Sequence, residues 1–266
     1  MNRKLDGSGS VRRLRAIGDS LAPRFSRAGH TNILKSTLAH WRPRPIDQPI
    51  PHELFAIPIR SNAPLLVVDV DEVLAMFMRG FERFVETHGF EMRITRFALF
   101  QNIFRVGELE HLDLTQGRAL FDAFFETDVE HIDAAPGAAA ALASLAETAT
   151  VVILTNAPGH SREPRARWLA KHQFPYPLVI NAGLKGPAVA ALAARTSGAT
   201  AFVDDLLPNL DSVAKDAPDV HRFQMVADAR LRPLALTAPG HHRRIDEWPT
   251  LHSAIARVFG IDEAGA

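Results

Sequence analysis

The sequence predicts an α/β protein, a three-layer doubly wound parallel sheet with a helical segment inserted after its first strand. Short apolar runs alternate with helical patterns from residue 134 onward, which indicates parallel strands joined by right-handed crossovers. An earlier apolar run, Leu65 to Val68, has the composition of a strand that is buried on both faces. Between these two parts lie about 60 residues, too many for one crossover, so an insertion is expected there.

Composition restricts the class of protein further. The chain has 266 residues, of which 47% are hydrophobic, and a chain of this size buries a core without covalent cross-links. It contains no cysteine, which excludes disulfides, thiolate zinc sites and a cysteine nucleophile. No apolar run approaches the roughly 18 residues of a membrane span, and no signal-type hydrophobic stretch follows Met1. We therefore expect a cytoplasmic globular protein with no membrane partner.

The formal charge of the chain is zero but unevenly distributed. Residues 1–44 hold ten Lys and Arg against two acids, a net charge of +8, and the remainder carries −8. Such a segment fits a transit sequence, a nucleic-acid-binding arm or a flexible tail, and the flexible tail is the interpretation favoured here. Residues 41–64 are rich in proline, which predicts an extended linker. Residues 1–60 are therefore predicted to form a basic, largely unstructured extension, with no nucleic-acid partner expected.

The inserted segment is predicted to be a helical cap at residues 75–133, which leaves residues 61–74 and 134–262 for the core. Apolar residues recur at helical spacing from Leu74 to Val85, with charged residues opposite, and Gly89 is a suitable stop. The remainder of the segment shows no strand-like alternation. Ten of the chain's sixteen phenylalanines lie between residues 77 and 125. Their helical spacing favours an aromatic helical core over a wall for stacking a nucleobase.

The second part of the chain predicts the remaining strands and helices in alternation. Strands are expected at residues 150–155, 178–181, 201–203 and 223–226. Helices are expected at about 137–148, 161–172, 187 onward and 208–213, with a closing helix around 251–258. This order predicts a parallel sheet with helices on both faces.

Polar side chains stand where the predicted strands end. They are Asp69 and Asp71, Thr155 and Asn156, Lys185 in the loop after the third strand, and Asp204 with Asp205. The carboxyl ends of parallel strands meet at one edge of a sheet, so we expect these side chains to converge. Four carboxylates in one cleft repel strongly, and a divalent cation would offset that repulsion. Because oxygen ligands without cysteine favour a hard cation, Mg²⁺ is the predicted cofactor.

Each of these residues also has a purely structural interpretation. Thr155 fits a simple strand end, Lys185 a surface lysine and Asp204 a helix cap. Asn209 fits a hydrogen bond to the site and an amide on a helix face equally well. The three arginines at 162, 165 and 167 are interpreted as a solvated helix face rather than a site for a second anionic group, and residues 241–244 as an exposed basic loop. It is their joint occurrence at successive strand ends that favours one shared site.

Taken in order, these strand ends resemble the four motifs of the haloacid dehalogenase superfamily, in its magnesium-dependent phosphatase type with a helical cap after the first motif. The first motif, an apolar strand followed by Asp-x-Asp-x-Thr/Val, is matched by Leu66 to Val73. The second, a strand ending in Thr, is matched by residues 151–156, and the third, a Lys before a helix, by Lys185. The fourth, a strand ending in paired acids, is matched by residues 201–205. Each motif is short, but the four together span residues 62–228 and imply a Rossmann-like core.

The resemblance implies a phosphohydrolase that cleaves a small phosphate monoester through an aspartyl phosphate. Asp69 would be the nucleophile, and Asp71 the general acid and base. Thr155 and Lys185 would hold the non-bridging phosphate oxygens, and Asn156 would bind substrate. The metal ligands would be Asp69 and Asp204, with Asp71 contributing its backbone carbonyl, and Asp205 would bind the metal either directly or through water.

The substrate implied by this resemblance is a small phosphorylated metabolite, such as a nucleotide or a sugar phosphate. Glu72 departs from the family pattern, which often has glycine there, and its bulk and charge put the fit of a substrate in question. Two other functions stay open. One is a scaffold of this fold that binds without turnover, and the other is a nucleic-acid-associated protein that uses residues 1–44.

Overall fold

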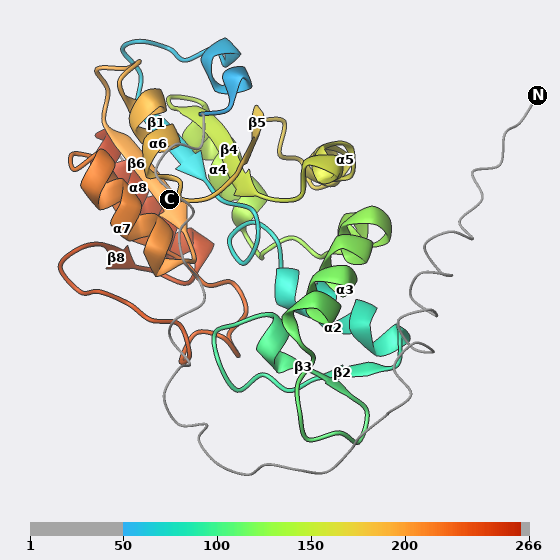
Figure 1. Ribbon diagram of the computed structural model, residues 1–266. Coiled ribbons are helices and arrows are strands. Elements are labelled where there is room, and N and C mark those ends of the chain that lie inside the picture. The colour runs from blue at the N-terminus through green and yellow to red at the C-terminus, as the bar shows by residue number, and fades with distance from the viewer. Residues whose placement is uncertain (1–49, 262–266) are drawn as a thin grey trace, which may run out of the picture.

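A six-stranded parallel sheet forms the centre of the protein. The computed structural model describes residues 50–261 (Figure 1). The strands of the sheet are β1 (Leu65–Val68), β4 (Thr150–Asn156), β5 (Leu178–Asn181), β6 (Thr200–Asp204), β7 (His221–Gln224) and β8 (Arg243–Arg244). They lie in the order β5–β4–β1–β6–β7–β8, and every neighbouring pair is parallel.

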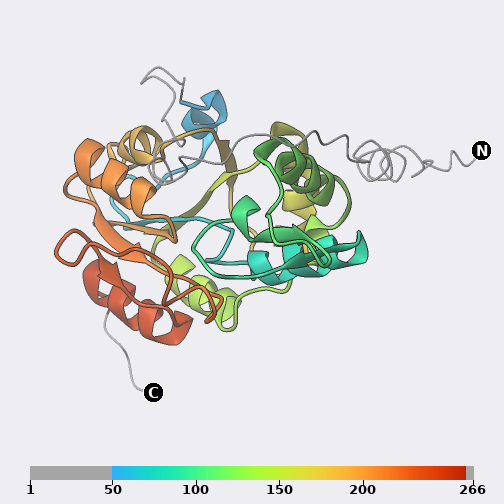
Figure 2. The ribbon, with the colours of Figure 1, turned by 60° about the horizontal axis from the view of Figure 1, so that its bottom comes forward.

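Helices cover both faces of this sheet (Figure 2). They are α4 (Ala138–Ala146), α5 (Arg162–Lys171), α6 (Gly186–Ala193), α7 (Leu207–Asp216) and α8 (Trp248–Phe259). Successive residues of a strand point to opposite faces. Accordingly, Leu66 and Val68 pack in one apolar cluster with α4 and α8, whereas Leu65 and Val67 pack in another with α6 and α7. The predicted three-layer, doubly wound core is confirmed.

β1 lies where the chain changes direction across the sheet. The chain adds β4 and β5 on one side of β1, then returns to add β6, β7 and β8 on the other. β1 pairs with both β4 and β6, and the amide of Asp69 donates to the carbonyl of Val203 at 3.0 Å. In open parallel sheets, ligands bind at the carboxyl edge of such a switch point. The topology therefore places Asp69 where this kind of sheet binds its ligands.

Residues 75–133 form a separate group of elements beside the sheet (Figure 1). They are α2 (Phe77–Thr87), β2 (Phe90–Met92), β3 (Ile103–Arg105) and α3 (Leu114–Thr127), with 3₁₀ turns at Phe100–Asn102 and Val129–His131. The antiparallel pair of β2 and β3 corrects the expectation of a segment without strands. Three-residue strands are too short to show a period of two in the sequence.

The interior of this segment is aromatic. The rings of Phe77, Phe81, Phe84, Phe124 and Phe125 pack against one another, with contacting centroids 5.3–6.2 Å apart. All five side chains are buried. Ring pairs at such separations contribute stability beyond the apolar area that they bury. These rings therefore form a core, as their helical spacing predicts.

The chain packs onto the sheet earlier than the sequence suggests. Residues His52–Ala56 form a 3₁₀ turn whose Leu54 is fully buried, and Ile57 joins the same apolar cluster as Val67. Nη1 of Arg195 donates to the carbonyl of Leu54 at 2.8 Å. The extension expected through residue 60 therefore contains an ordered part, because two apolar side chains in the proline-rich stretch complete the core. Residues 1–49, which include the basic segment, lie outside the described residues.

Other element boundaries differ from expectation by a few residues. α2 begins at Phe77 rather than Leu74 because the carbonyl of Val70 accepts the amides of residues 73–75 in a tight turn. β8 at Arg243–Arg244 corrects the expectation of an exposed loop, and it pairs with β7. Within residues 50–261, no helix is long and apolar enough to cross a membrane.

Candidate active site

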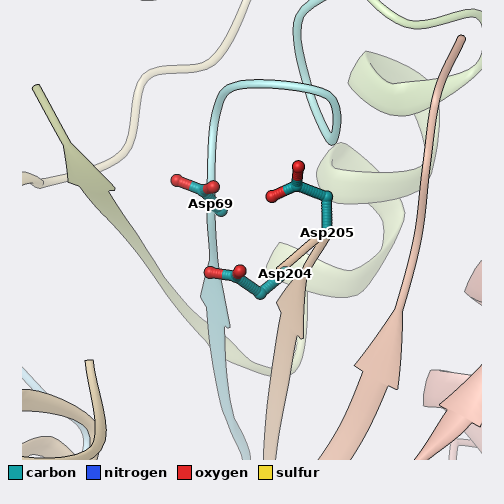
Figure 3. Close-up of side chains that lie close together, drawn as sticks. All are labelled: Asp69, Asp204 and Asp205. Atoms are coloured by element: carbon teal, nitrogen blue, oxygen red, sulfur yellow. The ribbon is translucent and has the colours of Figure 1, made fainter. Parts of the chain in front are cut away.

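Three buried carboxylates meet at the carboxyl edge of the sheet. Asp69 follows β1, and Asp204 and Asp205 stand at the end of the neighbouring β6. Each contributes an oxygen that lies within 4.8 Å of the other two, and Figure 3 shows the three side chains grouped at the ends of these strands. The strand register explains the grouping, because Val68 of β1 pairs with Val203 of β6 and the next residue in each chain segment is an aspartate.

A buried lysine joins two of these carboxylates. Nζ of Lys185 lies 2.7 Å from Oδ1 of Asp69 and 2.6 Å from Oδ2 of Asp204. Burial acts to lower the pKa of Lys185, but the charges of Asp204 and Asp69 outweigh it and raise that pKa above its usual value. Lys185 directly precedes α6, whose Gly186 lies so close to α7 that an added Cβ would collide with Ser212. This close approach fixes the loop that carries the ammonium group.

One ammonium group does not balance three carboxylates. Burial raises the pKa of Asp204 to about 6, against the opposing charge of Lys185. Burial and then the charge of Asp204 raise the pKa of Asp205 well above its usual value. Carboxyl groups held this way retain protons unless another cation supplies positive charge. The three carboxylates could therefore hold a cation.

The Asp204 carboxylate also accepts two hydrogen bonds. Nδ2 of Asn209 and the amide of Leu206 both donate to its Oδ1, at 2.9 Å. Asn209 is buried in the first turns of α7. Of the two interpretations that the sequence left open for Asn209, the structure supports the hydrogen bond to the site.

β4 brings a hydroxyl group to the same edge. Thr155 is fully buried, and among the described residues its Oγ1 has no hydrogen-bond partner. Burying an unpaired hydroxyl is costly, so its presence at the same edge of the sheet as the carboxylates suits a donor to a ligand. Asn156 is exposed, and its amide donates to the carbonyl of Gly183 at 2.9 Å and accepts from Asn181 at 2.8 Å. These bonds tie β4 to the loop before Lys185, and substrate binding by Asn156 stays a prediction.

Asp71 lies beside this group but pairs with a different residue. Nη2 of Arg165 donates to both carboxylate oxygens of Asp71, at 2.7 and 3.0 Å. Burial raises the pKa of Asp71 to about 6, opposed by the charge of Arg165 and reinforced by that of Asp69. The Asp71 side chain nevertheless keeps 22% of its surface exposed. Its carboxylate is not one of the three grouped above, so the metal contact predicted for Asp71 rests on its backbone carbonyl.

Arg165 is the site residue that the sequence interpretation missed. The expectation of a solvated helix face is wrong for Arg165, whose side chain is fully buried, whereas Arg167 in the same helix is 56% exposed. A signal was present in the sequence. Arg165, Trp168 and Leu169 are spaced three and four residues apart, and all three are buried on one face of α5. An arginine that shares the helical spacing of apolar residues is therefore predicted to be buried.

Glu72 serves the backbone of its own loop. Its φ is +59°, in the left-handed region that glycine adopts most readily. Its Oε1 accepts the amide of Met78 in the first turn of α2 at 2.7 Å, and its Oε2 accepts the amide of Asp228 at 2.9 Å. Burial raises the pKa of Glu72 to about 7. Both carboxylate oxygens of Glu72 are therefore used by backbone amides of the protein, which gives this residue a structural role in its loop.

Comparison with known proteins places the fold. No protein-family model and no curated protein sequence matches the chain. A conserved haloacid dehalogenase-like protein of unknown function from Agrobacterium tumefaciens has a similar structure, with a TM-score of 0.50 and 18% identity over 73% of this chain and 97% of that one. The chain has the haloacid dehalogenase fold.

Two further structures with this fold agree. A haloacid dehalogenase-like hydrolase from Streptococcus pneumoniae is 10% identical, and the putative HAD-hydrolase YfnB from Bacillus subtilis, bound to magnesium, is 13% identical. Both have TM-scores of 0.50, and the matches cover 73% of this chain and 98% and 99% of theirs. In the haloacid dehalogenase fold of this chain, the four strand-end motifs of the sequence come to one edge of the sheet.

Proposed function

We propose that the protein is a magnesium-dependent hydrolase that cleaves a small phosphate monoester through an aspartyl phosphate on Asp69. The observation that supports this most is the position of Lys185, whose ammonium group contacts both Asp69 and Asp204. More than a hundred positions separate Asp69 from Lys185 and Asp204, and the first, third and fourth motifs each contribute one of the three residues. A nucleophilic carboxylate, a fixed cation and two further carboxylates are the groups that phosphoryl transfer requires.

The residues present fit Mg²⁺. Asp69, Asp204 and Asp205 offer three buried carboxylate oxygens within 4.8 Å of one another, a set of hard oxygen ligands without sulfur or imidazole. The raised pKa values of Asp204 and Asp205 indicate missing positive charge at this point. The backbone carbonyl of Asp71 is proposed as a further ligand. When bound, Mg²⁺ would neutralise the carboxylates and the phosphoryl oxygens.

The protein's own groups then carry the reaction in two steps. In the first, an oxygen of Asp69 bonds to phosphorus as the bond to the leaving oxygen breaks, and Asp71 gives that oxygen its proton. In the second, water attacks the aspartyl phosphate and gives a proton to Asp71, which releases inorganic phosphate and restores Asp69. Lys185 and the unpartnered hydroxyl of Thr155 donate to the non-bridging oxygens throughout.

The substrate class proposed is a small phosphorylated metabolite. Sugar phosphates and nucleotides both present the phosphate monoester that this site would take. The five central phenylalanines of residues 75–133 are buried against one another and are not available to stack a nucleobase. We therefore expect other residues to recognise the leaving group.

A phosphate-release assay tests the proposal. Full-length protein with Mg²⁺ is screened against a panel of nucleotides and sugar phosphates, with Asp69→Asn and Asp211→Asn measured in parallel. Asp211 lies on α7 with its side chain 52% exposed, so its replacement is the matched control for a carboxylate lost nearby. We expect Asp69→Asn to abolish release with its circular dichroism unchanged, and Asp211→Asn to behave as wild type. Undiminished release by Asp69→Asn would refute the aspartyl-phosphate route.

A further inference from the structure

Arg165 occupies an unusual position for an arginine. Its side chain is fully buried, and its Nη2 alone donates to both oxygens of Asp71. The guanidinium carbon lies 5.2 Å from the ring centroid of Phe125 and 5.8 Å from that of Trp168. Arginine is almost never fully buried unless it is paired, so the pair with Asp71 is what allows this placement.

The contacts of Arg165 come from three parts of the chain. Asp71 belongs to the loop after β1, Trp168 to α5 and Phe125 to α3 of the inserted segment. Trp168 is itself fixed, because its Nε1 donates to the carbonyl of Ile132 at 2.8 Å. The guanidinium group is thus held by the core and by the inserted segment together, and it has little freedom to move. The carboxylate that it binds takes its position from this arrangement.

Stability alone does not account for the arrangement. Nε and Nη1 of Arg165 are buried and, among the described residues, have no hydrogen-bond partner. Burying two unpaired donors is costly, and a purely structural arginine would normally use them. The donors that are used converge on one carboxylate, and that carboxylate keeps part of its surface exposed beside the three grouped aspartates. The fold accepts this cost next to the group proposed to transfer protons.

We propose that Arg165 is a positioning residue, which holds the carboxyl group of Asp71 in place for proton transfer to the leaving oxygen. This inference rests on the proposed phosphohydrolase function. Asp71 gives its proton to the leaving oxygen as the bond to phosphorus breaks, and the resulting carboxylate stays paired with the guanidinium charge. In the second step the oxygen of a water molecule bonds to phosphorus as the bond between phosphorus and Asp69 breaks, and the water gives a proton to Asp71. Arg165 remains charged and transfers no proton itself.

If Arg165 positions Asp71, the effect of replacing Arg165 on the rate of hydrolysis depends on the leaving group of the substrate. An alkoxide is a poor leaving group and needs the proton from Asp71, whereas 4-nitrophenolate leaves readily without one. A loss of general-acid positioning therefore slows hydrolysis of an alkyl phosphate much more than hydrolysis of 4-nitrophenyl phosphate. A loss of packing, or of phosphate binding, slows both.

The experiment compares Arg165→Met with wild type in Mg²⁺, using n-butyl phosphate and 4-nitrophenyl phosphate. We expect kcat for the alkyl ester to fall by about 30-fold or more and kcat for the aryl ester by less than about threefold, with KM unchanged for both. Arg167→Met is the matched control, because Arg167 is an exposed arginine of the same helix that pairs with Glu130. It should leave both substrates unaffected.

The other outcomes overturn the proposal. Equal losses on the two esters would show a structural role, and a raised KM with unchanged kcat would show a role in binding an anion. If Arg165→Met does not fold, Arg165→Lys keeps the charge and the stem but loses the planar guanidinium, and it must show the same selective loss. In an Asp71→Asn background, Arg165→Met should add no further loss on the alkyl ester, and an undiminished loss there would refute action through Asp71. A wild-type protein that hydrolyses neither ester nor any compound of the panel would instead overturn the proposed function, and this inference with it.

Discussion

The protein contains two groups of buried or half-buried acids that differ in how their charge is balanced. In the aspartate cluster, Asp69 with Asp204 and Asp205, the ion pairs formed within residues 50–261 all involve Lys185. The second group, here called the brace, joins α2 to the loop after β7. It consists of Asp228 and Glu82 with Arg79 and Arg230, where Arg230 contacts Asp228 at 2.7 Å and Glu82 at 2.8 Å, and Arg79 contacts Asp228 at 3.4 Å.

The pKa values of the two groups shift in opposite directions. Burial acts to raise the pKa of Asp228, but the hydrogen bonds and charge of Arg230 outweigh it and lower that pKa below its usual value. In the cluster, burial and a neighbouring carboxylate raise the pKa of Asp205. Two acids matched by two guanidinium groups stabilise a contact, whereas three acids matched by one ammonium group need a further cation. Buried acids whose charge is not balanced by cations therefore indicate the functional group, whereas acids whose charge is balanced by arginines indicate the structural one.

Removal of metal tests this difference with the largest expected effect. In EDTA we expect phosphate release to fall by at least about 10³-fold, because the charge of the transferred phosphoryl group is then no longer neutralised. Mg²⁺ should restore release and raise the melting temperature, since a ligand at 100 times its Kd adds about 2.7 kcal/mol to the free energy of unfolding. Release that is indifferent to EDTA would remove the basis for treating the cluster as a cation site.

The pH dependence of stability should have opposite signs in the two groups. With its native pKa raised to about 6, Asp204 keeps a proton that the unfolded chain has lost above about pH 4, so its contribution falls as pH rises toward 6. For Asp228, with a lowered native pKa, the contribution is full above about pH 4 and is lost on further acidification. Urea unfolding of metal-free protein should therefore show the free energy of unfolding declining as pH rises from about 4 toward 6, and Asp71 and Asp205, whose native pKa values are also raised, act in the same direction. Asp204→Asn should make that decline smaller, and a decline of equal size in the variant would contradict the assignment.

The sequence predicted the aspartate cluster but not the brace, for a physical reason. Asp69, Asp204 and Asp205 each end a strand or directly follow one, and Lys185 directly precedes a helix. Parallel pairing of β1 with β6 alone brings Asp69 beside Asp204. The brace depends on how α2 docks against a loop more than 140 positions away, and no local pattern encodes that docking. For Arg165, helical spacing predicts that the side chain lies on the buried face of α5 but does not predict its partner. The strands β2 and β3 have three residues each, too few to show the alternation that predicts a strand.

Breaking the brace should cost stability while leaving the metal site intact. In Asp228→Asn, Arg79 and Arg230 lose the carboxylate whose side chain is fully buried, and Glu82 remains as the partner of Arg230. Loss of one partner of a buried pair costs about 3–5 kcal/mol, which we reduce to about 2 kcal/mol because the Arg230 side chain is 39% exposed. Urea unfolding measures this loss.

The matched control for the brace is Asp122→Asn. Asp122 pairs with Arg118 on the surface of α3, where both side chains are at least 40% exposed. A surface pair of this kind contributes less than about 0.5 kcal/mol. Mg²⁺ affinity, measured by calorimetry, should match wild type in both variants. A weakened Mg²⁺ affinity in Asp228→Asn would mean that the two groups of acids are coupled through the loop of Glu72.

Within the two groups of acids, the smallest change in stability is expected from Asp205→Asn, and its sign is the sharpest test of the comparison. Removing an acid from a group with excess negative charge should stabilise the metal-free protein by about 1 kcal/mol, whereas removing one from the brace destabilises it. The same replacement should weaken Mg²⁺ binding by about 10–100-fold, because the ion loses a charged oxygen at the cluster. Thermal unfolding in EDTA and calorimetric titration with Mg²⁺ separate the two effects. If the variant is less stable without metal and binds Mg²⁺ as tightly as wild type, Asp205 belongs with the structural acids. The contrast between the two groups would then rest on Asp69 and Asp204 alone.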